Sequence, residues 1–219
     1  MARSGYGIVM VSISLQAARP AIVAVGRWLD GRGWAPATAG NYSVRLDDGN
    51  FAVTVSGKHK GRLTEEDVMV VGADGRSLDG KRPSAETALH LQIYRLFPDI
   101  GAVLHSHSPS AVGLTRALSG RDGWTIRGQE LLKAYPGITT HDTEITLPIV
   151  DNSQDMRVIE DAITPRLIDP AAPPAYLIRS HGLYGWGRDM AEAERVIETT
   201  EWLIEAERAE RLFKQELPA

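Results

Sequence analysis

The stretch YSVRLDDGNFAVTV, residues 42–55, constrains the fold more than any other part of the sequence. Two runs in which apolar and polar residues alternate flank the turn residues DDGN, and this pattern predicts a β-hairpin. Two further apolar runs, AYLI and LYGWG, lie on either side of the dipeptide His181–Gly182 and predict two strands joined by a tight turn. Because hairpins join antiparallel strands, we expect a mixed or mainly antiparallel sheet.

Helical signals separate and follow these strands. We expect helices over residues 17–34, 83–97, 108–118 and 190–214. Gly31 and Gly33 end the first of them, and the third has Ser108 as its N-cap and Pro109 at its first position. The short apolar run GAVLH before Ser108 predicts a buried strand. The sequence therefore predicts a single-domain α/β protein whose central, mainly antiparallel sheet is flanked by helices.

Composition narrows the class of partner. The formal net charge of -4 gives no reason to expect nucleic acid or an anionic membrane as a partner, and no apolar run is long enough to span a bilayer. The chain has no cysteine, which excludes disulfides and thiolate metal sites and fits a cytoplasmic location. Residues 1–14 are expected to form a disordered or extended tail before a domain of residues 15–219, and Met10 is an alternative start to Met1.

Three histidines lie at predicted strand ends. His105 and His107 are two apart on an extended segment, so their side chains point the same way while Ser106 faces away. His181 occupies the turn between the last two predicted strands. Imidazole is a favoured zinc ligand, and a catalytic zinc commonly takes three protein ligands. A His-x-His pair alone is more often just two polar residues at the end of a strand. The third histidine at a strand end is the observation that favours a metal site.

The remaining titratable groups are ambiguous when taken singly. His90 is expected on a helix as a face or edge residue, His141 in a loop as a hydrogen-bonding group, and His59 in a basic loop. Glu86 and Glu130 each read as an ordinary helix glutamate unless the fold holds them beside a metal. The turns TAGNYS and SGKHKG supply glycine, hydroxyl and lysine groups that can bind phosphate, or they are simple turns next to the hairpin.

Together, these segments resemble the class II aldolase/adducin-like family. The motifs TAGNYS, SGKHKG, PSAETALH, AVLHSHS and YLIRSHG occur in the family's order and cover most of the chain beyond the tail. The resemblance implies a largely antiparallel class II aldolase-like sheet covered by helices, a homotetramer, and one Zn²⁺ per subunit held by His105, His107 and His181. It also implies a small phosphorylated ketose as substrate.

The segments SGKHKGRLTEEDVMVV, RGQELLKAY and HGLYGWG are most similar to dehydratases of this family. That resemblance implies that Glu130 is the catalytic acid/base. It further implies that substrate and its phosphate contact Asn41, Ser56, Gly57, Lys133 and Glu86. Aldolases of the family often have two serines before the glutamate at position 86, whereas Ser84 is followed here by Ala85. An aldolase or epimerase that uses Glu86 is the alternative activity, and a non-catalytic binding module is the alternative from another class.

Overall fold

The computed structural model describes residues 12–217, and its framework is an eight-stranded sheet with the order β3-β2-β1-β4-β8-β7-β6-β5. The strands are β1 (Asn41–Arg45), β2 (Phe51–Thr54), β3 (Val68–Val71), β4 (Ala102–Ser106), β5 (Gly123–Arg127), β6 (Glu144–Val150), β7 (Ala175–Ile178) and β8 (Gly182–Gly187). Within the described residues these strands pair antiparallel, except that β6 and β7 pair parallel. The predicted α/β class and both predicted hairpins are confirmed.

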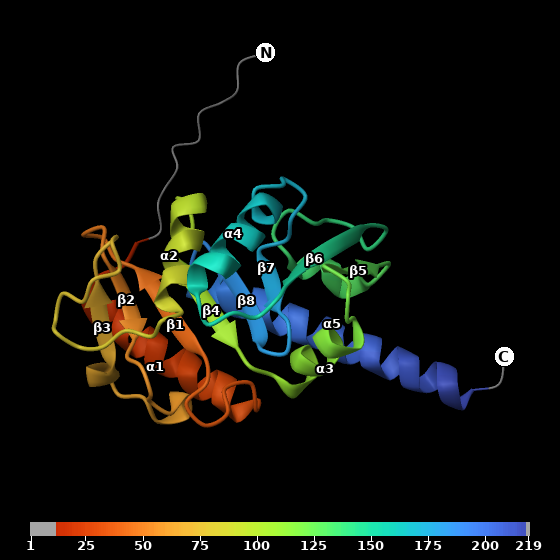
Figure 1. Cartoon of the computed structure of the whole chain (residues 1–219), viewed down its shortest axis with the longest axis horizontal. Coiled ribbons are helices and arrows are strands. Elements are labelled where there is room, and N and C mark those ends of the chain that lie inside the picture. The colour runs from red at the N-terminus through yellow and green to blue at the C-terminus, as the bar shows by residue number, and fades with distance from the viewer. Residues whose placement is uncertain (1–11, 218–219) are drawn as a thin grey trace, which may run out of the picture.

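Helices cover both faces of this sheet (Figure 1). They are α1 (Leu15–Gly31), α2 (Thr87–Leu96), α3 (Pro109–Ala117), α4 (Met156–Leu167) and α5 (Met190–Glu216), with short 3-10 turns η1 (Lys60–Arg62), η2 (Glu65–Asp67) and η3 (Glu130–Ala134). Apolar residues of α1, α3 and α5 pack in one core with Leu104 of β4, whereas those of α2 and α4 pack in a second core with Val103. Because successive side chains of a strand point to opposite faces, β4 contributes to both cores.

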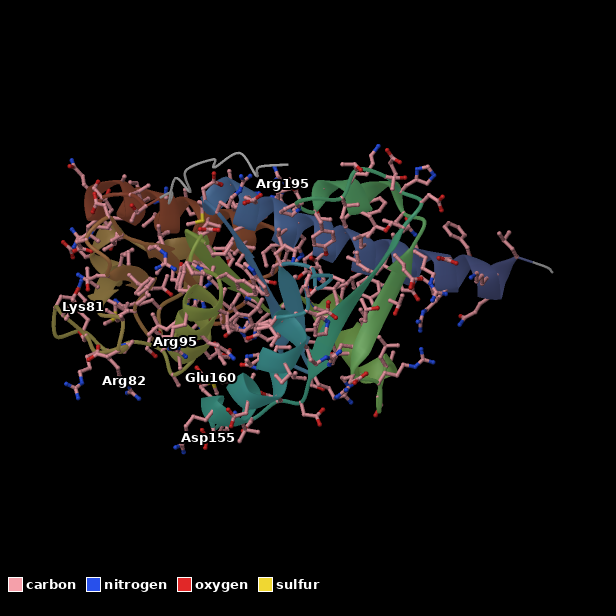
Figure 2. The ribbon with its side chains drawn as sticks, turned by 90° about the horizontal axis from the view of Figure 1, so that it is seen from above. Lys81, Arg82, Arg95, Asp155, Glu160 and Arg195 are labelled. Atoms are coloured by element: carbon pink, nitrogen blue, oxygen red, sulfur yellow. The ribbon has the colours of Figure 1, made fainter. Side chains whose placement is uncertain are left out.

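Helices α2 and α4 lie side by side on their face of the sheet. The guanidinium of Arg95 on α2 forms an ion pair with Glu160 on α4 at 3.3 Å. Both residues are labelled in Figure 2, which views the molecule from above. Gln92 on α2 donates to the backbone carbonyl of Glu160 at 2.8 Å. These contacts hold α2 in place, together with Glu86, the residue that precedes it.

Two sequence predictions need comment. Helix α2 begins at Thr87, not at Pro83 as expected, because Pro83 pairs with Val55 in an isolated β-bridge, so Glu86 is the N-cap of the helix. The tail expected over residues 1–14 falls mostly outside the described residues. Ile13 forms a bridge with Leu46, and the Ser14 hydroxyl accepts a hydrogen bond from an amide of α1. Among residues 12–217, no helix has the length and apolar character needed to cross a membrane.

Helix α5 packs closely on β8 because that strand contains glycines. A Cβ atom added at Gly187 would lie 2.5 Å from the backbone nitrogen of Ala193 and 2.7 Å from the carbonyl carbon of Glu192. A glycine at this position therefore lets the first turn of α5 contact the sheet.

We expect Gly187→Ala to destabilise the fold by about 1–3 kcal/mol, because the new methyl group meets backbone that cannot rotate away. The measurement is the free energy of unfolding in urea. Gly113→Ala in α3 is the matched control, since a Cβ there meets nothing within 4 Å and alanine favours a helix interior. Equal stability of the two variants would contradict this packing.

Candidate metal centre

Four side chains from three parts of the fold meet at one end of the sheet. Glu86 is the N-cap of α2, His105 lies in β4, His107 follows that strand, and His181 lies in the turn between β7 and β8. Each offers one ligand atom, and these atoms all lie within 4.8 Å of one another. The structure thus brings together the three histidines singled out in the sequence and adds Glu86 to them.

Strand geometry explains why the histidines converge. His105 and His107 point to the same side of extended backbone, and their ring centroids are 4.4 Å apart. β8 lies next to β4 with Tyr184 opposite His105, and the two rings stack at 4.0 Å. A Cβ atom at Gly182 would overlap the backbone carbonyl oxygen of Ser106, so glycine after His181 lets the turn approach β4.

Hydrogen bonds orient two of the imidazoles. The Nδ1 of His105 lies 3.0 Å from the backbone carbonyl oxygen of Leu183, and the Nδ1 of His181 lies 3.2 Å from Oδ1 of Asn152. When Nδ1 donates its proton to such an oxygen, the lone pair is on Nε2, which is the form that a metal binds. The Nε2 of His107 is buried and has no hydrogen-bond partner among the described residues. An unpaired buried nitrogen in this position fits a metal ligand.

The separations also suit a small cation. The Nε2 atoms of His105 and His181 are 3.4 Å apart, and Oε1 of Glu86 lies 3.7 Å from the first and 2.9 Å from the second. Ligand atoms around a tetrahedral zinc with bonds near 2.0–2.1 Å are about 3.3 Å apart. The residues present therefore fit a bound metal ion.

The electrostatics keep the group in its ligand form. Burial lowers the pKa of His105 to about 4 and that of His107 to about 3, so both imidazoles are neutral near pH 7. Burial alone would raise the pKa of Glu86, but the facing histidines outweigh burial and hold this pKa well below its ordinary value. Neutral imidazoles beside one carboxylate form a donor set typical of divalent metals.

A buried hydrogen-bond chain supports Glu86 from behind. Asn41 lies opposite His105 in the sheet, and its amide donates to Glu86 at 2.6 Å. The Oδ1 of Asn41 accepts from Nε2 of His90, whose Nδ1 lies 2.7 Å from the hydroxyl of Ser43. His90 is only 2% exposed, so it is a buried residue that supports the site and not a surface residue of the helix. Its spacing of four residues from Glu86 was the signal in the sequence.

Lys60 is a second residue that the sequence did not single out. Its side chain is 2% exposed, and its ammonium donates to the backbone carbonyls of Thr38 and Lys58 at 2.7 Å each. Burial lowers its pKa to about 8, against the opposing effect of Glu86. Lys60 therefore links the turns TAGNYS and SGKHKG through Thr38 and Lys58, and it places a buried cation near the Glu86 carboxylate.

The other predicted residues lie outside the four-residue group. Ser56 and Gly57 are exposed in the turn after β2, where Gly57 has a left-handed φ of 76°. Glu130 is at the start of η3, its side chain is 69% exposed, and it pairs with Lys133 and with His141. No contact joins Glu130 to the group within the described part of the chain.

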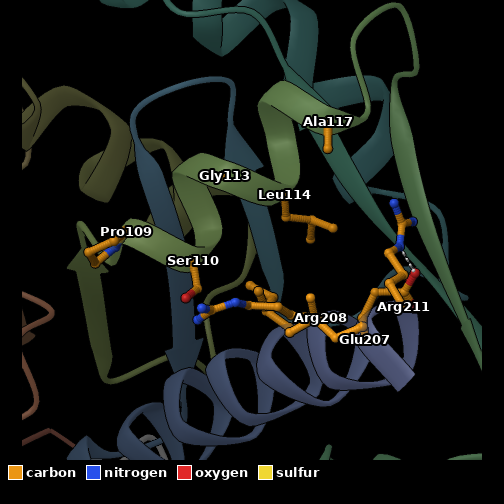
Figure 3. Close-up of a pocket in the computed structure, with 10 residues that line it drawn as sticks. Pro109, Ser110, Gly113, Leu114, Ala117, Glu207, Arg208 and Arg211 are labelled. Atoms are coloured by element: carbon orange, nitrogen blue, oxygen red, sulfur yellow. Dashed lines mark hydrogen bonds and ion pairs between the residues drawn. The ribbon is translucent and has the colours of Figure 1, made fainter. Parts of the chain in front are cut away.

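An apolar groove lies on the opposite face of the sheet from the histidines. It has a volume of about 420 Å³ and runs between α3 and α5, where Leu114 and Arg208 are among its lining residues (Figure 3). Leu114 belongs to the core under α1, α3 and α5, whereas the Tyr184 ring that stacks on His105 belongs to the core under α2 and α4. The groove is therefore separate from the candidate metal centre.

Comparisons with a family profile and with known relatives agree on one family. The sequence profile of the class II aldolase and adducin N-terminal domain matches residues 20–207. A methylthioribulose-1-phosphate dehydratase of Methylococcus capsulatus is 50% identical over 186 residues, which cover 85% of this chain and 90% of the relative. The enzyme of that name from Pseudomonas paraeruginosa is 49% identical over 187 residues, covering 85% and 91%.

Solved structures agree with this fold. The putative aldolase/epimerase/decarboxylase YgbL from Escherichia coli has a TM-score of 0.75 at 28% identity, and the match covers 88% of each chain. The l-fuculose-1-phosphate aldolase from Thermus thermophilus has a TM-score of 0.74 at 28% identity, covering 92% of this chain and 97% of the other.

Buried His90 makes stability depend on pH. Burial lowers its pKa from 6.5 to about 4, so between these values the unfolded chain binds a proton that the folded chain does not. The free energy of unfolding of chelator-treated protein is expected to fall as the pH falls from 6.5 to about 4, by up to roughly 1.4 kcal/mol per pH unit for this group. His90→Gln should show a shallower fall. Equal slopes for variant and wild type would contradict this burial of a neutral imidazole.

Proposed function

The chain belongs to the class II aldolase and adducin family, and on that premise we propose that it is a methylthioribulose-1-phosphate dehydratase. The enzyme removes water from 5-methylthioribulose 1-phosphate and forms 2,3-diketo-5-methylthiopentyl 1-phosphate, a step of methionine salvage. The observation that carries the proposal is the identity of about half of the aligned residues with relatives of this name, in alignments that cover 85% of the chain. The His/Glu group supports it, because it supplies a metal-binding site of the kind such chemistry uses.

Zinc is the metal that we assign to His105, His107 and His181, one ion per subunit, with Glu86 beside it. Neutral imidazoles and a carboxylate are ligands that catalytic zinc takes. A zinc ion bound there supplies Lewis acidity, which makes the C3 proton next to the C2 carbonyl of the substrate more acidic.

The remaining chemistry is proton transfer by a side chain. A base removes the C3 proton, an acid protonates the departing C4 hydroxyl, and the enol that forms relaxes to the second ketone, so one water leaves in all. We assign Glu130 to these transfers, which are worth roughly 10²–10⁴-fold in rate. The side chain of Glu130 is exposed in a single chain, and a neighbouring subunit packed against it would shield it from water.

Sheet topology keeps Glu130 away from the histidines of its own chain. Arg127 at the end of β5 pairs with Glu144 at the start of β6, while Ile178 at the end of β7 pairs with Val150 at the end of β6. β6 has seven residues, so these two ends are roughly 20 Å apart. Glu130 follows the first end, and His181 follows the second. We therefore infer that Glu130 completes the metal site of an adjacent copy in a homotetramer.

Phosphate recognition is assigned to the two turns near Lys60. Ser56 offers its hydroxyl and Gly57 its backbone amide in an exposed turn, and Lys133 would come from the adjacent copy with Glu130. Asn41 lies at the same end of the sheet, but its amide group is engaged by Glu86 and His90, so we assign it mainly to orienting Glu86.

A cytoplasmic location of the protein stays a prediction.

One observation favours a second activity. Glu86 lies within the metal group, where it could act as the working carboxylate of a sugar-phosphate aldolase or epimerase. Such an enzyme would break the C3–C4 bond of a ketose phosphate instead of removing water. The missing second serine at Ala85 argues against it.

The mass of the product tests the proposed function. Zinc-loaded protein incubated with 5-methylthioribulose 1-phosphate should give a product lighter than the substrate by one water. His107→Ala is the control and should give no product, since it removes a proposed zinc ligand. Substrate of unchanged mass would contradict the proposal, and two smaller fragments would support the aldolase.

Subunit mixing tests whether Glu130 acts across an interface. Glu130→Gln and His181→Ala should each lower the turnover number at least 100-fold when pure. Co-expressed, they should recover roughly a quarter of wild-type activity, because an intact group on one chain meets an intact Glu130 on its neighbour. A mixture as inactive as its parents would mean that both residues act within one chain.

A further inference from the structure

The segment His105-Ser106-His107-Ser108 presents different residues to the two sides of the sheet. Its histidines face the metal group, whereas both serines face α5 on the other side. There the hydroxyl of Ser106 donates to Oε1 of Glu201 at 3.0 Å, and that of Ser108 donates to Oε2 at 2.5 Å. A single carboxylate thus accepts hydrogen bonds from the side chains on either side of His107.

The position of Glu201 is unusual for a glutamate. It is 1% exposed, lies near the middle of α5, and shares its helix stripe with the apolar residues Ile197 and Ile204. Burial raises its pKa to about 7, against the lowering effect of the two serines. Burying a carboxylate costs free energy that a leucine would not cost, so the stability of the core alone does not explain it.

The hydrogen bonds of Glu201 join two elements. The hydroxyl of Ser108 also accepts a hydrogen bond from the amide of Ala111 at 3.0 Å and so caps α3. Ser106 is the last residue of β4. Glu201 therefore links the end of the strand, the start of the helix and α5, and His107 lies between the first two.

His107 is the histidine that most needs this link. The rings of His105 and His181 are each held through Nδ1, but no hydrogen bond to the His107 ring is found within the described residues. Its backbone amide donates to the carbonyl of Trp34 at 2.7 Å. The direction of its side chain therefore depends on the backbone that Ser106 and Ser108 anchor.

We propose that Glu201 is a positioning residue of the metal site, which sets the direction of His107 through Ser106 and Ser108 from the opposite face of the sheet. This inference rests on the proposed function, since it takes the His/Glu group as a zinc site. Outer residues that orient metal ligands typically contribute 10- to 100-fold to metal affinity.

The test measures zinc affinity by competition with a chromophoric chelator, together with the visible spectrum of the cobalt-substituted protein. Glu201→Gln keeps the size of the side chain but leaves one acceptor oxygen for two hydroxyl donors. It should weaken zinc binding at least tenfold and shift the cobalt absorption bands. Ser106→Ala combined with Ser108→Ala should do the same, because the carboxylate then has nothing to hold.

A matched control lies one turn further along α5. There Glu205 accepts a hydrogen bond from Ser110, which projects from α3 toward α5 at the exposed groove (Figure 3). This pair also joins α3 to α5, but it does not flank a histidine. Glu205→Gln and Ser110→Ala should keep the zinc affinity and cobalt spectrum of the wild type.

Wild-type zinc affinity and cobalt spectrum in Glu201→Gln would overturn the inference, even with a lower melting temperature, because Glu201 would then only stabilise the core. If Glu201→Gln does not fold, the single variants Ser106→Ala and Ser108→Ala decide by the same two readouts. A wild type that binds no zinc would overturn this inference and the zinc assignment together. A wild type that binds zinc but does not dehydrate the substrate would overturn the proposed activity alone.

Discussion

The pairing of β4 with β1 and β8 is the constraint on which the rest of the site depends. This register places Asn41 and Tyr184 on either side of His105. His105 therefore has the amide of Asn41 on one side and the stacked ring of Tyr184 on the other. It also brings the turn that carries His181 against the end of β4, at a distance that glycine at position 182 permits. A shift of one residue would turn His105 and His107 to the opposite face of the sheet.

The two faces of the sheet hold the site in different ways. On the face with α2 and α4, neutral hydrogen-bonding groups that include His90 lead from the core to Glu86. On the face with α5, the carboxylate of Glu201 accepts hydrogen bonds from Ser106 and Ser108, the two neighbours of His107. His90 and Glu201 are buried and hydrogen-bonded to specific partners, so side chains next to the metal group are supported from both faces of the sheet.

Local patterns in the sequence predicted the hairpins, the helix that Ser108 caps, and the common direction of His105 and His107, because turn residues, capping residues and strand periodicity are local features. The start of α2 was predicted four residues early, since helix signals do not reveal that Pro83 pairs with a distant strand. Glu201 looks like one more glutamate of a charged helix, and only its place on the apolar stripe marks it. The partner of Glu130 depends on contacts between copies, which one sequence does not specify.

The location of the metal tests the central claim most directly. Anomalous diffraction at the zinc edge, from crystals of the zinc-loaded protein, should show one strong peak per subunit between the Nε2 atoms of His105, His107 and His181. The electron-density map from the same crystals should place Glu130 of an adjacent subunit beside that peak. A peak elsewhere in the subunit, or none at this end of the sheet in zinc-loaded crystals, would contradict the account.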